Sequence, residues 1–188
     1  AYRRMGAFPE SHMMFMSDNS KFREERMTAT PFNAARPKTS LAEIEASVDK
    51  EVGVSRWFTI DQALITAFGK LTQDEYFIHM NPERAAKETP FGGSIAHGFL
   101  TLSMMSAMAY DALPEVEGRT MGMNYGFDKI RFLAPVPAGS KVRGHFVVSA
   151  VEKKSPQQVV VRYAISVEIE GKPKPALAAE WLTVAFFG

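Results

Sequence analysis

Residues 71–105, LTQDEYFIHMNPERAAKETPFGGSIAHGFLTLSMM, contain the features from which the fold follows. Asp74 and His79 lie five positions apart, a glycine-rich loop follows, and the pair His97-Gly98 opens the most apolar run of the chain. From residue 96 to about residue 113, the side chains are apolar or small on every side of a helical projection. A helix without a polar face is buried all round, so we expect a long central helix that other elements wrap.

The second half of the chain supplies the wrapper. Apolar and polar residues alternate with a period of two along residues 161–169, which is typical of a half-buried strand. Residues 141–154 and 175–187 predict two more long strands, and residues 121–136 predict one or two shorter ones. Because short turns separate the long strands, the sequence predicts an antiparallel meander packed on the helix, which is an α+β fold.

The remaining elements lie before the apolar run. Residues 40–52 predict a short helix with Ser40 as its cap, and Asn81-Pro82 starts a second helix at residues 81–88. Residues 1–39 have neither helical nor strand period and are predicted to be an N-terminal arm or linker. Within this arm, the sequence SHMM is compatible with native sequence or with a cloning remnant. Residues 40–188 are then one domain.

Composition excludes several functional classes. The formal net charge of +1 provides no field that would recruit nucleic acid. The absence of cysteine excludes disulfides, thiolate nucleophiles and thiolate metal sites, and it fits a reducing compartment, so we expect a cytoplasmic protein. No uncharged apolar run reaches about 18 residues, so we expect no membrane span.

Asp74 and His79 are candidates for acid–base chemistry. A helix is predicted to end near Gln73 and another to start at Asn81, so the chain between them bends and can point both side chains at one place. A carboxylate and an imidazole around one water suffice to deliver and remove protons at neutral pH. The alternative is structural: Asp74 caps a helix and His79 is a hydrogen-bonded core histidine.

Gly98 is a candidate for binding a ligand oxygen. It falls in the first turn of the apolar helix, where backbone N–H groups lack partners and carry the positive end of the dipole. A glycine there leaves the backbone open to a carbonyl oxygen, as in an oxyanion hole, or lets the helix pass close to the sheet. Spacings of 5 and 18 residues among Asp74, His79 and His97 match no standard metal pattern, so we expect no metal.

The motif TQDEYFIHMNPERA followed by FGGSIAHGFLTLS resembles the signature of the MaoC-like dehydratases, the (R)-specific enoyl-CoA hydratase group. The motifs IAHGFLTLS, NYGFDKIRF, PVPAGSKVRG and AEW, in this order, are similar to the nodulation-protein-N-like branch. The resemblance spans about residues 41–186. It implies a single hot-dog fold, a long helix wrapped by a curved antiparallel sheet, and a homodimer whose sheets join edge to edge.

The resemblance also implies roles for individual residues. Asp74 and His79 match the family's catalytic pair, Gly98 matches its oxyanion glycine, and Ser106 matches a serine that lines the pocket in some relatives. The chain departs from the hydratase pattern before and after Asp74, where Gln73, Tyr76 and Phe77 replace the glycine and the Asn-Pro pair. Tyr76 is therefore predicted to narrow the substrate pocket, which affects substrate choice more than the catalytic pair.

The predicted function is reversible addition of water to a trans-2-enoyl thioester, giving an (R)-3-hydroxyacyl thioester in fatty acid metabolism. No cofactor is expected, because the thioester itself acidifies C2. The substrate is an acyl-CoA or an acyl-carrier-protein thioester, with Arg84 and Lys87 as candidate phosphate ligands and Met104, Met105 and Met108 as an apolar wall. Two alternatives stay open: a hot-dog acyl-CoA thioesterase, and a non-catalytic module that binds acyl thioesters.

Overall fold

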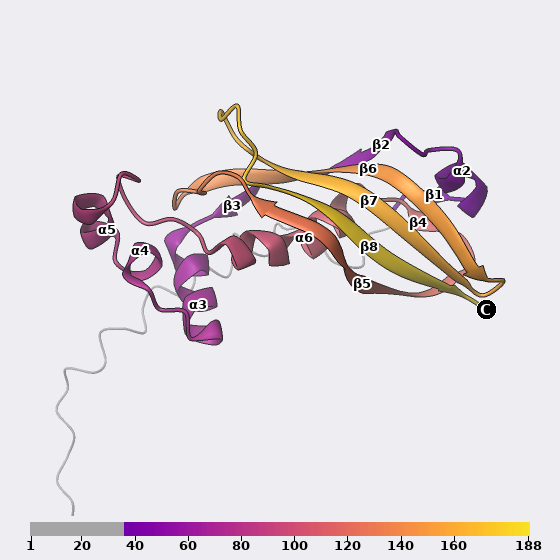
Figure 1. The fold of residues 1–188 in the computed structure, drawn as a ribbon, viewed down its shortest axis with the longest axis horizontal. Helices are drawn as coiled ribbons and strands as arrows, with labels where there is room; N and C mark the ends of the chain where they lie inside the picture. The colour runs from indigo at the N-terminus through magenta and orange to yellow at the C-terminus, as the bar shows by residue number, and fades with distance from the viewer. Residues whose placement is uncertain (1–35) are drawn as a thin grey trace, which may run out of the picture. The chain divides into compact units, whose positions relative to one another are not determined.

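Helix α6 (Gly98–Ala112) runs along the inner face of an antiparallel sheet in the computed structural model, which describes residues 36–188 (Figure 1). Helices α3, α4 and α5 gather near the N-terminal end of α6, and α2 lies at the other end of the sheet. The elements are β1 (Lys38–Thr39), α2 (Leu41–Glu45), β2 (Glu51–Val54), β3 (Phe58–Ile60), α3 (Gln62–Thr72), α4 (Phe77–Met80), α5 (Pro82–Glu88), α6, β4 (Glu115–Val116), β5 (Arg119–Phe132), β6 (Ser140–Ser155), β7 (Gln158–Ile169) and β8 (Leu177–Phe187).

The sheet contains the predicted meander. Strands β6, β7 and β8 pair in sequence order, and the full strand order is β2-β6-β7-β8-β5 with β3 also pairing with β6. Residues 119–132 form one strand with three register shifts against β8, where the sequence predicted one or two shorter strands. This strand, β5, forms an edge of the sheet next to β8 rather than next to β6, which follows it in the chain.

Only one side of α6 is buried, so the prediction of a helix buried all round is wrong for the single chain. Met105 and Met108 are almost fully buried against the sheet, whose inner face contributes Phe146 and Leu177 to the same core. Phe99, on the opposite side of the helix, is 66% exposed. Helix α6 is apolar on two opposite faces, and the sheet covers only one of them. Within the described part of the chain, nothing covers the face that carries Phe99.

Cap residues explain where the shorter helices begin and end. Asn81 caps α5 by accepting a hydrogen bond from the Arg84 N–H at 2.9 Å, as its sequence predicts. Ser40 and Glu43 form a reciprocal capping box on α2. The helix predicted over residues 40–52 nevertheless ends at Glu45: Asp49 adopts a left-handed conformation with φ 63°, and the chain continues as β2.

The end of the predicted arm is held to the domain. Strand β1 pairs in parallel with β4, so residues 38–39 belong structurally with the residues that follow. Residues 1–35 lie outside the described part, and the boundary at residue 40 stays a prediction. Among residues 36–188, no helix combines the length and the hydropathy that crossing a membrane requires.

Gly53 tests how closely α6 approaches the sheet edge. A Cβ at this position would lie 2.4 Å from the carbonyl oxygen of Ala112, a backbone atom that cannot move aside cheaply. We expect Gly53→Ala to lower the free energy of unfolding by about 1–3 kcal/mol, as overpacking typically does. Urea unfolding measures this loss. The matched control Gly93→Ala, whose Cβ would meet nothing within 4 Å, should change stability by less than about 0.5 kcal/mol. Equal stability of the two variants would contradict the close approach.

Candidate active site

Residues 94–97 form a strap that joins the helical end of the molecule to the sheet. The Ile95 N–H donates to the Ile78 carbonyl at 3.0 Å, and the Ala96 N–H donates to the Val136 carbonyl at 2.8 Å. The Ala138 N–H donates in turn to the Ser94 carbonyl at 2.9 Å. The strap is therefore hydrogen-bonded on both sides, and it leads directly into the first turn of α6.

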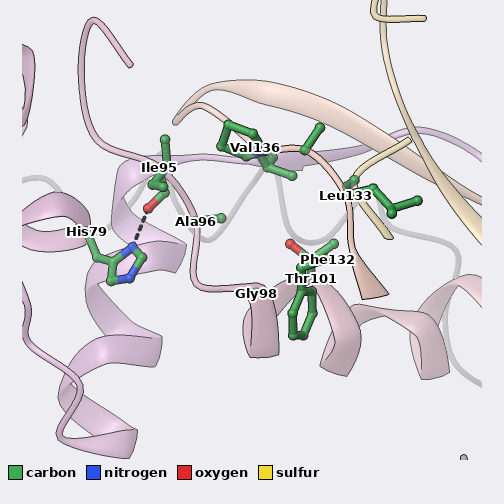
Figure 2. A pocket seen from close by; sticks show the side chains of 11 residues that line it. His79, Ile95, Ala96, Gly98, Thr101, Phe132, Leu133 and Val136 are labelled. Carbon is green, nitrogen blue, oxygen red and sulfur yellow. Dashed lines mark hydrogen bonds between the residues drawn. The ribbon is translucent and has the colours of Figure 1, made fainter. Parts of the chain in front are cut away.

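His79 is fixed to this strap by its side chain. It lies on the short helix α4, is only 9% exposed, and has its Nδ1 2.7 Å from the carbonyl oxygen of Ile95 (Figure 2). Because a carbonyl oxygen can only accept, Nδ1 carries the proton in this bond. In the neutral ring, Nε2 is then left with a lone pair that can accept a proton.

Gln62 holds the backbone around His79. Its amide nitrogen donates to the His79 carbonyl at 2.8 Å and to the Thr66 hydroxyl at 3.2 Å. Its amide oxygen accepts a short hydrogen bond from the hydroxyl of Ser94, a buried residue of the strap. One side chain at the start of α3 thus connects α4 to the strap. Nothing in the sequence around Gln62 marked this role, since its partners are 17 and 32 residues away.

Asp74 and His97 complete a cluster around His79. Asp74 is exposed and follows the left-handed residue Gln73 that ends α3. One ligand atom from each of Asp74, His79 and His97 lies within 4.8 Å of the other two. The His97 Nε2 is 2.9 Å from the Asp74 carbonyl oxygen, and the two imidazole rings are stacked with their centroids 3.8 Å apart.

The stacked rings do not suit a metal ion. The planes of His79 and His97 are only 28° apart, and the lone pairs of an imidazole lie in its plane. The lone pairs of the two rings therefore lie in two nearly parallel planes that are stacked on each other, so they do not point at one position between the rings. A tetrahedral or octahedral ion needs convergent donors, so this arrangement favours proton transfer over metal binding.

His79 and Gly98 face the same cavity. Its volume is about 280 Å³, and its wall is mostly apolar (Figure 2). A Cβ on Gly98 would lie 3.0 Å from the ring of Phe132, so the glycine lets this ring pack closely against the start of α6 at the cavity wall. The lining residues are His79, Ile95, Ala96, Gly98, Thr101, Phe132, Leu133, Ala134, Pro135, Val136 and Ala176.

The surroundings keep His79 neutral. Burial lowers the pKa of His79 below its ordinary value, and the hydrogen bond to the Ile95 carbonyl opposes this shift. Proximity to His97 lowers the same pKa further, while the Asp74 carboxylate raises it. The net shift is downward, so the ring is neutral at pH 7 and its Nε2 can act as a base.

Asp74 is not among the residues that line the cavity, and it approaches the site only through its contact with the two imidazoles. The other predicted site residues also lie outside the cavity lining. Tyr76 is 59% exposed and packs edge-on against Phe77. Ser106 is half-buried two turns along α6 from Gly98, and Thr101 is the α6 hydroxyl that lines the cavity. Arg84 pairs with Glu88 and stacks on the Phe77 ring, and Lys87 is exposed in the last turn of α5. Of the three predicted methionines, Met105 and Met108 are buried in the core and Met104 is partly buried against it.

A family model described as a MaoC like domain matches residues 43–169. The chain belongs to the MaoC-like dehydratase family. It is 49% identical over 148 residues to Nodulation protein N of Rhizobium leguminosarum bv. viciae, a match that covers 79% of this chain and 92% of the relative. It is 41% identical over 141 residues to 3-hydroxyacyl-thioester dehydratase Z of Mycobacterium tuberculosis, covering 75% of this chain and 92% of the relative. The predicted family, its nodulation-protein-N-like branch and the hydro-lyase class are confirmed.

Solved structures confirm the predicted hot-dog fold for this MaoC-like dehydratase. The MaoC-like dehydratase from Rhodospirillum rubrum aligns with a TM-score of 0.61 at 19% identity, covering 75% of this chain and 93% of that one. The (R)-hydratase from A. caviae involved in PHA biosynthesis aligns with a TM-score of 0.56 at 24% identity, covering 72% and 94%. At these identities the likeness concerns the fold.

The lowered pKa of His79 predicts a specific dependence of stability on pH. In the unfolded chain this imidazole titrates near about pH 6.5, while in the folded protein it titrates lower. The unfolded state therefore binds more protons, so stability is full above about pH 6.5 and falls as the pH drops towards the folded pKa. We expect His79→Gln to lose less stability than the wild type between about pH 7.5 and 5.5. Urea unfolding at fixed protein concentration measures the difference, and equal losses in both proteins would refute the lowered pKa.

Proposed function

We propose that this protein catalyses the reversible addition of water to a trans-2-enoyl thioester, giving the (R)-3-hydroxyacyl thioester. The observation that carries the proposal is that a neutral imidazole, His79, and the start of a helix, Gly98, face one apolar cavity. The Asp74 carboxylate approaches the same imidazole cluster. A base, an oxygen-binding backbone and an apolar wall are what hydration of an enoyl thioester requires.

His79 and Asp74 handle the proton of the attacking water. The Nε2 lone pair of His79 accepts this proton while the water oxygen bonds to C3 of the enoyl group, and Asp74 orients the water. The electrons of the double bond move to the thioester oxygen, and the proton then returns to C2. Every atom of the water ends in the product, so the reaction uses no cofactor.

The Gly98 N–H stabilises the charge that develops on the thioester oxygen. It lies in the first turn of a 15-residue helix whose N-cap residue, His97, makes no side-chain capping bond. The first N–H groups of such a helix have no partner within the helix and carry its positive dipole end. An oxygen-binding donor of this kind contributes on the order of 10²–10³ in rate.

The relatives support an acyl thioester as substrate, because one of them is named a 3-hydroxyacyl-thioester dehydratase. The acyl chain would lie against residues 132–136 and Ala176, which form the apolar cavity wall in place of the methionines predicted from sequence. The carrier is CoA or acyl-carrier protein. Lys87 is free to meet its phosphates, whereas Arg84 is paired with Glu88. The reaction would serve fatty acid metabolism in the cytoplasm, which the absence of cysteine suits.

A homodimer would cover the apolar residues that β5 and the start of α6 expose. We define the β5–α6 face as Phe99, Met121, Met123, Tyr125 and Phe132, whose side chains are between 48% and 66% exposed. Strand β5 forms 14 residues of sheet edge, and long apolar edges of this kind favour pairing with another strand. A two-fold axis would bring two β5 strands together with both faces buried. Phe132 also lines the cavity, so the second copy would lie next to the active site.

Two substitutions test the proposed catalytic pair. We expect Asp74→Asn and His79→Gln each to slow hydration of crotonyl-CoA by about 10²–10⁴-fold, because each removes a group that handles the proton. Loss of absorbance of the conjugated double bond follows the reaction. The control His145→Gln changes a histidine bound to Glu51 and Glu168 on the sheet, away from the cavity, and should keep wild-type turnover.

Other outcomes of this assay identify the alternatives. Unchanged turnover in both variants would end the catalytic-pair hypothesis. Release of free thiol from acyl-CoA without loss of the enoyl absorbance would identify a thioesterase. Tight acyl-CoA binding without turnover at any chain length would identify a binding module.

The dimer is tested by a charge placed on the β5–α6 face. We expect Tyr125→Arg to shift the protein from dimer to monomer, because the new charge would have to be buried at the interface. Size-exclusion chromatography with light scattering measures the mass. The control Val54→Arg changes another exposed hydrophobic residue, on β2 at the opposite edge of the sheet, and should stay dimeric. A monomeric wild type would exclude the proposal.

A further inference from the structure

His97 is buried in a way that the proposed chemistry does not yet explain. It is the N-cap residue of α6, yet its side chain does not cap the helix and is turned away into the cluster with His79. The residue is 2% exposed. Its Nε2 donates to the Asp74 carbonyl oxygen at 2.9 Å, because that oxygen can only accept. Its Nδ1 is buried and has no hydrogen-bond partner.

The ring of His97 is held between two others. His79 is stacked on it at 3.8 Å, and the Phe68 ring of α3 lies 5.2 Å away at an angle of 52°. Space around the ring is tight. A Cβ on Gly69 would lie 3.0 Å from the Asp74 carbonyl oxygen and 3.3 Å from Cε1 of His97. The glycine lets the end of α3, the Asp74 backbone and the imidazole come together.

We propose that His97 is a positioning residue of the active site: a neutral imidazole, protonated on Nε2, that fixes the Asp74 backbone and the ring plane of His79. The inference rests on the proposed hydratase function. Through one bond and one stack, His97 would set the distance between the two groups that handle the proton. It need not touch the substrate, since it is absent from the cavity lining and acts through its neighbours.

The unpartnered Nδ1 explains why the ring must stay neutral. Protonation would create an N–H at a buried position where no acceptor is present, which leaves a charged donor unsatisfied. The titratable groups that face the His97 ring are Asp74, from the turn after α3, and His79, from α4. Helix α3 itself contacts the ring only through the uncharged residues Phe68 and Gly69. A charge on His97 would also oppose proton uptake by His79 at 3.8 Å.

Two substitutions separate the contribution of the His97–Asp74 hydrogen bond from that of the stacking between His97 and His79. His97→Gln keeps an amide N–H for the Asp74 carbonyl and loses the stacked ring, while His97→Phe keeps a ring and loses the bond. We expect His97→Phe to lower kcat for crotonyl-CoA about 100-fold with KM changed less than about threefold, because displaced catalytic groups slow the chemical step. His97→Gln should recover about tenfold of that loss, since it restores the donor. Wild-type kcat in both variants would overturn the proposal.

A control and a measurement without substrate distinguish positioning from packing. Phe68→Leu loosens the other side of His97 without removing its bond to Asp74, so it should lower the Tm while reducing kcat by less than about threefold. A kcat loss equal to that of His97→Phe would reduce His97 to a packing residue. Nitrogen-15 NMR of the free protein at about pH 8 should find the ring proton of His97 on Nε2. A protonated or Nδ1–H ring overturns the inference at any activity, whereas a wild type without turnover overturns only the proposed hydratase function.

Discussion

The strap at residues 94–97 is the constraint on which the site depends. It bonds to Ile78 on one side and to Val136 on the other, so it fixes the small helices relative to the sheet. Its Ile95 carbonyl also selects the tautomer of His79, and its last residue starts α6. One short segment thus determines the position of the base, the direction of its lone pair and the place where the first free N–H groups of the helix begin.

Two glycines near the strap are required by the close packing that the strap imposes. Gly98 avoids the ring of Phe132, and Gly69 avoids the Asp74 carbonyl. Each stands where two backbone segments, or a backbone and a ring, come too close together for a side chain. The buried polar groups of this region are paired with one another, since Ser94 binds Gln62 and Gln62 binds the His79 carbonyl. The unpartnered Nδ1 of His97 is the exception, and exceptions of this kind tend to mark functional sites.

Much of the fold could be predicted because its signals are local. The period of two along β7 and the Asn81-Pro82 start of α5 depend only on neighbouring residues. The helix predicted to continue through residues 46–52 was wrong because pairing of β2 with β6, nearly a hundred residues away, outweighs the local helical pattern. The proximity of Asp74 to His97 was equally hidden, since it requires a hydrogen bond across 23 residues. The family resemblance pointed to Asp74, His79 and Gly98, whereas spacing alone left both a structural and a catalytic reading open.

The exposed side of α6 links the fold to the site. The sequence gives this helix apolar residues on both sides, and the sheet of one chain can cover only one of them. The uncovered residue Phe99 lies edge-on to Phe132 with the ring centroids 5.8 Å apart, and Phe132 in turn closes the cavity over Gly98. A partner that covered Phe99 would therefore restrict the ring that bounds the cavity. Water would then be excluded from the thioester by the same contact that buries the edge strand, and a drier cavity strengthens the interaction between the Gly98 N–H and a developing oxyanion. Assembly and catalysis would depend on one aromatic contact.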